Sequence, residues 1–236
     1  MINRVFELTG DQWGLVTRKQ LEIAGVPRTT IERLTGPNAA LERVAFGVYR
    51  LTGSPIPDHL DLRAAWLQLA PGIPAWKRSS TAGVVSHQSA AALYGVGHLP
   101  VDRHEFTVGG RKQTRRTDVR IHERHVAEED WIVLRGLPVT RPSRIASDLL
   151  FDNQDPASIG QIIADSIDNS FDYPSNFAAS LTSHAGRFGM RRGDGLALLR
   201  WLLEIVGNKD TELRIREARN SLVHESPGQL SPSVAT

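Results

Sequence analysis

The chain has 236 residues, 40% of them hydrophobic and 23% charged, a composition that suits a globular protein with its own core. It contains no cysteine, so disulfides and every cysteine-based zinc or iron–sulfur site are excluded. The formal net charge of +2 arises within the first 50 residues and the rest of the chain is balanced, so nucleic-acid binding would have to come from local clusters.

The first residues and the most apolar stretch of the chain indicate the cellular location of the protein. Residues 1–6 lack the apolar run of a signal peptide. Leu196–Val206 is interrupted by charges and is too short to span a bilayer. We expect a soluble, cytoplasmic protein that does not bind membranes.

Residues 13–51 predict a helix, a tight turn, a second helix and a two-stranded ribbon, the outline of a winged helix-turn-helix. Thr17 is a candidate N-cap for a helix over 18–24, and Gly25 tolerates the positive φ of a helix stop. Pro27 suits the first turn of the second helix, whose Ile31 and Leu34 form one apolar face. The runs 41–44 and 48–51 predict the hairpin.

The polar side chains of this segment predict a DNA-binding surface. Hydroxyl and guanidinium groups near the start of a second helix can bond phosphates and base edges, and a basic hairpin can touch the DNA backbone. The alternative is a small helical domain with a hairpin that binds nothing. The predicted DNA-binding residues are Arg18, Lys19, Arg28, Thr29, Thr30, Arg33, Arg43 and Arg50.

A second domain is expected to follow a linker at Gly53–Pro57. Helical patterns at 60–70 (with Asp58 as N-cap) and 87–94 precede short β-prone runs at 105–109, 119–122 and 131–134. Helices are expected near 142–151, 155–168, 175–184, 196–206 and 211–222. The sequence therefore predicts an α+β fold: an N-terminal winged helix-turn-helix (1–54), a larger mixed α/β domain with a small sheet and a helical C-terminal part (58–225), and a disordered tail (226–236).

The loop between the first two β-prone runs is rich in cations. Arg111, Lys112, Arg115 and Arg116 form a possible second basic patch for an anion or nucleic acid. A solvated hairpin tip, balanced by acids from elsewhere, explains the same residues.

For three other clusters of polar residues we favour a structural or surface role over a functional one. His122 and His125 flank Glu123 without the spacing of a zinc site, so surface histidines are expected. Asp165 and Asp168, near Asp172, suit the polar face of a helix as well as a metal or acid–base site. The charges of Glu212, Arg214, Arg216 and Arg219 suit ion pairs on a helix surface. We predict no catalytic residues, no metal and no cofactor.

Several of these motifs resemble those of a known family. Gly14-Leu15-Val16-Thr17, Ala24-Gly25-Val26, Leu41–Val44 and Gly47–Leu51 resemble the N-terminal domain of AbiEi antitoxins of type IV toxin–antitoxin systems. Val85–Ala91 and Gly136–Thr140 resemble the family's second domain, so the resemblance covers roughly residues 1–150. Pro27 departs from the pattern, because relatives often have a serine there that caps the recognition helix.

The resemblance implies a transcriptional repressor that binds inverted repeats in the double-stranded operator DNA of its own operon. It also implies a non-enzymatic antitoxin against a partner of the AbiEii type, a nucleotidyltransferase-like toxin that need not form a stable complex with it. Two alternatives remain: a winged-helix regulator whose second domain senses a ligand or dimerises, and a nucleic-acid-processing enzyme that uses Asp165 and Asp168 or the charged C-terminal region.

Overall fold

The computed structural model describes residues 2–36 and 39–224, so the expected tail at 226–236 lies outside the described residues. The chain forms two compact units: Met1–Val85 with Asp102–Val139, and Ser86–Val101 with Thr140–Thr236. The first unit holds two small sheets and the second is helical, so the expected mixed α and β architecture is confirmed. These units differ from the division expected at residues 54–58, and a functional division at that point stays a prediction.

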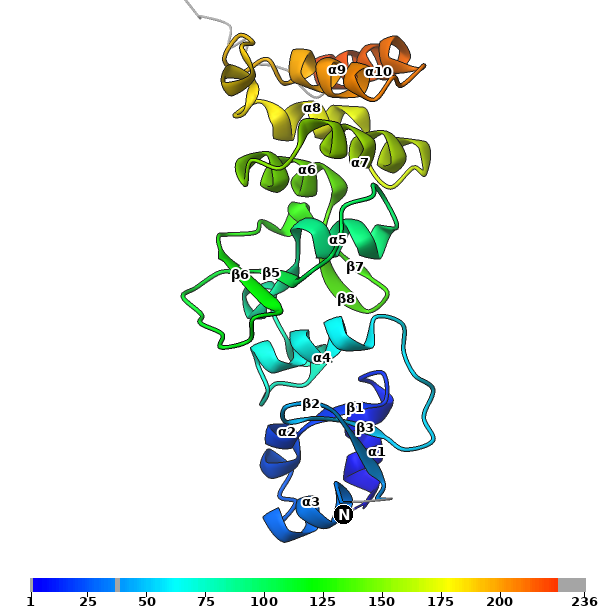
Figure 1. The fold of residues 1–236 in the computed structure, drawn as a ribbon, viewed down its shortest axis with the longest axis vertical. Coiled ribbons are helices and arrows are strands. Elements are labelled where there is room, and N and C mark those ends of the chain that lie inside the picture. The colour runs from blue at the N-terminus through cyan, green and yellow to red at the C-terminus, as the bar shows by residue number, and fades with distance from the viewer. Residues whose placement is uncertain (1, 37–38, 225–236) are drawn as a thin grey trace, which may run out of the picture. The chain divides into compact units, whose positions relative to one another are not determined.

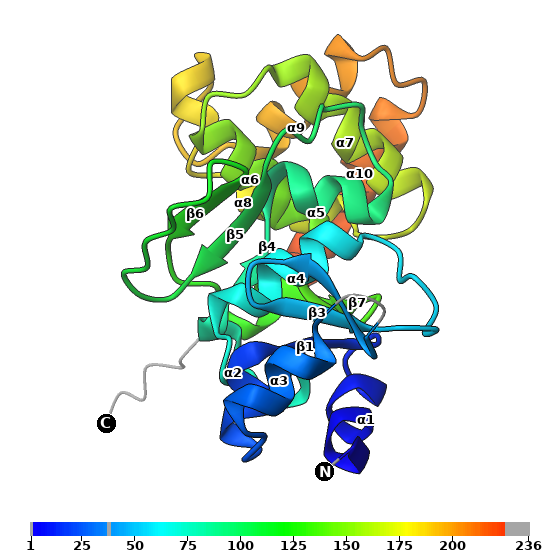
Figure 2. The ribbon, with the colours of Figure 1, turned by 60° about the horizontal axis from the view of Figure 1, so that its bottom comes forward.

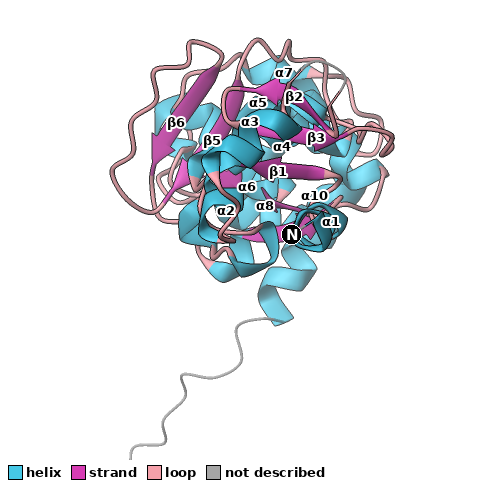
Figure 3. Ribbon diagram, turned by 90° about the horizontal axis from the view of Figure 1, so that it is seen from below, coloured by secondary structure: helices cyan, strands magenta, loops and turns pink. Residues whose placement is uncertain are grey.

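Within residues 2–36 and 39–51, the chain forms an N-terminal module of three helices and a three-stranded sheet. The sheet is antiparallel with the strand order β1-β3-β2 (Figure 3). Figure 2 shows α2 and α3 as consecutive helices next to this sheet. The elements are α1 (Ile2–Gly10), β1 (Leu15–Thr17), α2 (Arg18–Ile23), α3 (Arg28–Leu34), β2 (Leu41–Ala45) and β3 (Val48–Leu51).

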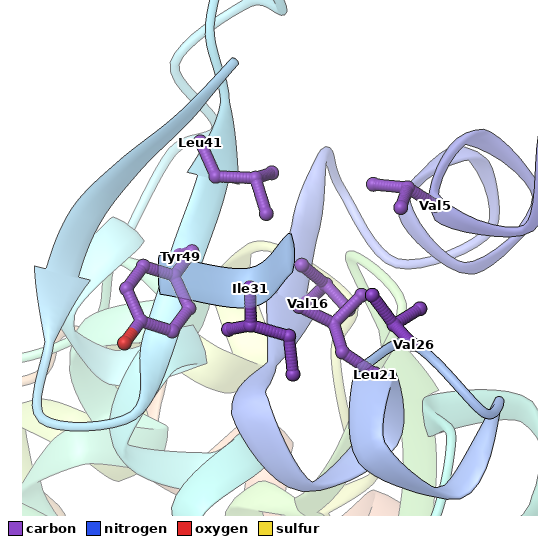
Figure 4. Packing of buried hydrophobic residues seen from close by; sticks show 7 residues of the cluster. All are labelled: Val5, Val16, Leu21, Val26, Ile31, Leu41 and Tyr49. Carbon is purple, nitrogen blue, oxygen red and sulfur yellow. The ribbon is translucent and has the colours of Figure 1, made fainter. Parts of the chain in front are cut away.

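A compact apolar core holds α2 and α3 at a fixed angle. Leu21 of α2, Val26 of the turn and Ile31 of α3 are all buried and belong to one cluster (Figure 4). The turn between the helices requires Gly25, whose φ of 77° is costly for other residues. Because each helix contributes to the same core, the polar face of α3 has a defined orientation within the module.

The start of α2 is capped as the sequence predicts. The Thr17 hydroxyl accepts a hydrogen bond from the Gln20 amide, and the Gln20 side chain accepts one from the Thr17 amide. This reciprocal capping box satisfies two backbone donors at the helix end. Pro27 is the N-cap of α3, one residue earlier than the first-turn position expected for it.

The rest of the first unit combines one helix with a five-stranded sheet of order β6-β5-β4-β8-β7. Strands β5 and β6 run parallel, so a crossover loop joins them. The expected N-cap at Asp58 is wrong, because α4 begins after His59, which takes a left-handed conformation. The elements are α4 (Leu60–Leu69), β4 (Val84–Val85), β5 (His104–Val108), β6 (Val119–Glu123), β7 (Trp131–Leu134) and β8 (Leu137–Thr140), with 3₁₀ turns at Ala75–Lys77, Ser80–Ala82 and Glu128–Asp130.

The N-terminal module is bonded to α4 and the segment that follows it. The Trp13 ring meets the Trp66 ring edge-on, with centroids 5.9 Å apart. Buried Gln20 donates to the Ile73 carbonyl at 3.2 Å, and the Gln12 side chain accepts from the Ala75 amide at 2.9 Å. These buried contacts make the module part of the first unit's folded structure.

The second unit is a stack of helices (Figure 1). Gly160 of α7 lies so close to α9 that a Cβ there would overlap the Leu202 carbonyl oxygen. Among the described residues, no helix is long and apolar enough to cross a membrane. The helices are α5 (His87–Tyr94), α6 (Pro142–Phe151), α7 (Pro156–Asp168), α8 (Pro174–Leu181), α9 (Gly195–Ile205) and α10 (Thr211–His224), with a 3₁₀ turn at Ala185–Phe188.

Candidate nucleic-acid interface

Helix α3 presents a polar face to solvent. Ile31 is 1% exposed and anchors the helix in the core, whereas Arg28, Thr29 and Arg33 are exposed and Thr30 is half-buried. The Arg28 Nε lies 2.9 Å from Glu32 Oε1. Arg33 has no ion pair among the residues that the structure describes. The face therefore offers two guanidinium groups and two hydroxyls at one end of the module.

The first turn of α2 contributes two more cations. Arg18 and Lys19 both pair with Glu22, at 3.1 and 3.5 Å. The hydrogen bond from Arg18 is the largest cause of the lowered pKa of Glu22. The Arg18 amide donates to the Gly47 carbonyl at 2.8 Å, which fixes the start of α2 against the turn of the β2–β3 hairpin.

The two arginines of the hairpin differ in their surroundings. Arg43 is exposed, and its guanidinium carbon lies 5.7 Å from the centre of the Phe46 ring. The Arg50 side chain is only 13% exposed, pairs with Glu42 at 2.6 Å and donates to the Ser54 carbonyl. A DNA contact by either residue stays a prediction, and Arg43 is the more accessible of the two.

The basic loop at residues 109–118 is the crossover between β5 and β6, so the alternative of a hairpin tip is wrong. Arg111 and Arg115 are exposed, and Lys112 is half-buried, where burial and then Arg78 lower its pKa. Arg116 donates from Nε to Asp118 Oδ1 at 2.8 Å and also donates to Gln68. The hydrogen bond from Arg116 lowers the pKa of Asp118 to about 2. The four cations of the predicted patch therefore have different surroundings.

Of His122 and His125, both expected at the surface, only one is exposed. His125 is exposed, but His122 is 8% exposed, and its Nε2 lies 3.8 Å from Glu105 Oε1. The expectation of a surface side chain at His122 is wrong, because β6 turns this residue toward the covered face of the sheet. The sequence gives no sign of this, since Val119-Arg120-Ile121-His122 alternates apolar and polar residues and would place His122 on the same face as exposed Arg120.

The acidic residues of the second unit form structural bonds. Asp165 accepts from the Gly97 amide and from Gln161, both at 2.7 Å. Asp168 accepts from Arg214 at 2.8 Å, and buried Asp172 accepts from the Ser143 amide at 2.9 Å. Each carboxylate thus ties segments together, which favours the structural interpretation of these acids over a reactive one.

Comparisons with known proteins identify the class of the N-terminal module. Residues 3–52 match the model of a family described as "Transcriptional regulator, AbiEi antitoxin". The resemblance to AbiEi antitoxins is therefore confirmed for the module that carries α2, α3 and the hairpin, and the resemblance of residues 85–91 and 136–140 to the family's second domain stays a prediction.

The fold also resembles a solved structure over nearly the whole chain. It is described as "Crystal structure of RV2827C protein from Mycobacterium tuberculosis", with a TM-score of 0.52 and 16% sequence identity. The similarity covers 98% of this chain and 83% of that one. At this identity the similarity concerns the fold alone. A search of curated proteins found no match.

Proposed function

We propose that the protein is a DNA-binding antitoxin of a type IV toxin–antitoxin system that represses its own operon. In this proposal the N-terminal module is a winged helix-turn-helix, α3 is the recognition helix and the β2–β3 hairpin is the wing. The observation that carries it is the exposed face of Arg28, Thr29 and Arg33 within the segment that matches AbiEi transcriptional regulators. Such a protein would act in the cytoplasm on an operator with inverted repeats.

The DNA-binding part is tested on the full-length protein with the DNA upstream of its gene. A side chain that contacts a base typically contributes about 1–3 kcal/mol, so Arg28→Ala should weaken binding about tenfold or more. Glu22→Ala is the control, because it removes an exposed acid and should not weaken binding. Unchanged gel-shift affinity for Arg28→Ala and for Arg33→Ala would defeat the assignment of α3.

The antitoxin part is tested with the neighbouring gene. A nucleotidyltransferase-like toxin encoded beside this gene should arrest growth when expressed, and co-expression of this protein should restore growth. A toxin of that kind whose effect persists in the presence of this protein would contradict the proposal. No stable complex is required, so co-purification is not the criterion.

A ligand-responsive regulator is the second candidate, and one cavity favours it. A cavity of about 330 Å³ in the first unit is lined by four of the five tryptophans: Trp13, Trp66, Trp76 and Trp131. The buried indole N–H of Trp131 has no acceptor among the described residues. Buried donors normally have a partner, so a small planar molecule with an acceptor atom would suit this cavity. DNA binding without protection against any neighbouring toxin would favour this candidate.

A further inference from the structure

A groove in the first unit joins the N-terminal module to the basic loop. It has a volume of about 740 Å³. Its walls come from the first turn of α2, the β2–β3 turn, the end of α4 and residues 113–116 of the loop. The side chains that matter for its chemistry are Arg18, Lys19, Phe46, Gln68, Arg115 and Arg116.

Hydrogen bonds hold these walls in register. The Arg18 amide donates to the Gly47 carbonyl at 2.8 Å, and the Gln68 side chain donates to the Phe46 carbonyl at 2.7 Å. The side-chain oxygen Oε1 of Gln68 in turn accepts from Arg116, which is also fixed by Asp118. Gln68 thus couples the turn of the hairpin to the basic loop, which holds these two walls of the groove together and fixes Arg116.

The charge of the groove favours an anionic occupant. The groove is lined by four basic side chains and one acidic side chain. The acidic side chain, Glu22, already pairs with Arg18 and Lys19. Arg115 is exposed and has no ion pair within the described part of the chain. Its positive charge is therefore available to a ligand at the side of the groove opposite α2.

The position of the groove narrows the choice of anion. In the proposed binding mode, its walls include the start of α2, the helix that crosses the DNA backbone in a helix-turn-helix, and the turn of the wing. Phe46 at this turn is 83% exposed, which gives the groove an apolar surface suited to a deoxyribose ring. A sugar–phosphate chain can contact both the cations and the aromatic ring of this groove, whereas a small anion would leave the ring without a partner.

We propose that this groove binds the sugar–phosphate backbone of one DNA strand beside the base pairs that α3 contacts, with Arg115 as a phosphate contact. The proposal rests on the proposed DNA-binding function and extends it beyond the N-terminal module. In this proposal the arginines of the basic loop differ in function. Arg115 binds DNA, and Arg116 positions the loop through its bonds to Gln68 and Asp118. Arg111 lies outside the groove.

The test compares Arg115→Ala with Arg111→Ala, which removes the same charge from the same loop but outside the groove. Binding of the full-length protein to operator and to random duplex is measured from about 50 to 200 mM salt. Arg115→Ala should weaken binding to both duplexes equally and lower the salt slope by about one. Arg115→Lys should restore the slope, and Arg111→Ala should leave it unchanged. Arg115 is exposed and has no ion pair among the described residues, so its removal should not change the thermal unfolding curve.

The outcomes separate this inference from the proposed function. If Arg28→Ala weakens operator binding while Arg115→Ala behaves as Arg111→Ala does, the groove does not hold DNA and the inference is overturned alone. A loss confined to the operator would make Arg115 a base-reading residue and would also overturn it. Wild-type protein with no affinity for either duplex would overturn the proposed function itself.

Discussion

Among single residues, the two arginines of the wing, Arg43 and Arg50, should differ in their effect on protein stability when they are replaced by alanine. Arg43 is exposed on β2, so Arg43→Ala should weaken binding to operator and random DNA alike and lower the salt slope by about one. Arg50 is largely covered and bonded to Glu42 and Ser54. Arg50→Ala should therefore also destabilise the fold, by about 1 kcal/mol.

Two measurements separate the roles of these arginines. Salt-dependent binding curves report the phosphate contact, and denaturant unfolding reports the structural bonds. If Arg50→Ala leaves the free energy of unfolding unchanged while lowering the salt slope as Arg43→Ala does, its bonds to Glu42 and Ser54 are not structurally important. The two arginines would then be equivalent DNA contacts.

The ion pair on α3 also has a measurable consequence. Arg28 pairs with Glu32 at the surface, and this pair competes with any contact between Arg28 and DNA. Glu32→Ala should release Arg28 and remove an acid from the interface, so it should tighten binding to random duplex DNA. The dissociation constant at low salt measures this. Weaker binding would indicate that Glu32 holds Arg28 in its DNA-contacting position.

At the scale of elements, the packing of α7 on α9 depends on one glycine. A Cβ at Gly160 would overlap the Leu202 carbonyl oxygen, and backbone cannot move as a flexible side chain can. Gly160→Ala should destabilise the protein by about 1–3 kcal/mol. Gly10→Ala in α1 is the matched control, because nothing lies within 4 Å of a Cβ there. Equal unfolding free energies for the two variants would show that α7 and α9 can move apart at little cost.

The sequence predicted the elements whose signals are local. The helices follow from apolar periodicity, the start of α2 from Thr17, and the hairpin from two β-prone runs around Gly47. Strand β1 has no such local signal, because its three residues are all buried and are too few to show alternation. Strand β8 is not predictable from its sequence, because Pro138 argues against a strand.

The sequence predicts which residues of the candidate site are basic, but it does not predict which partners they bond to. The bond from Arg116 to Gln68 joins residues 48 positions apart, and no local pattern signals it. The pairing of Arg50 with Glu42 depends on their register across the hairpin, where the two residues face each other. Sequence patterns identified basic clusters, whereas the distinction between available and occupied cations required the fold.

At the scale of the whole molecule, repression and toxin antagonism should be separable by point substitutions. The N-terminal module shares buried bonds with the segment after α4, so truncation at residues 54–58 would expose buried polar groups. A full-length Arg28→Ala/Arg33→Ala variant avoids that problem. It should lose repression of its promoter but still restore growth in the presence of the toxin. Loss of both activities in this variant, with the fold intact, would mean that one surface serves both.

A nuclease footprint of the full-length protein on its own promoter tests the claim that α3 reads a specific operator. Protection should cover inverted repeats whose centres are about 10 base pairs, or a multiple of that, apart, as expected for a pair of recognition helices. The Arg28→Ala/Arg33→Ala variant should lose this protection at the same protein concentration. A promoter with no protected sequence, or protection that survives the double substitution, would contradict the claim.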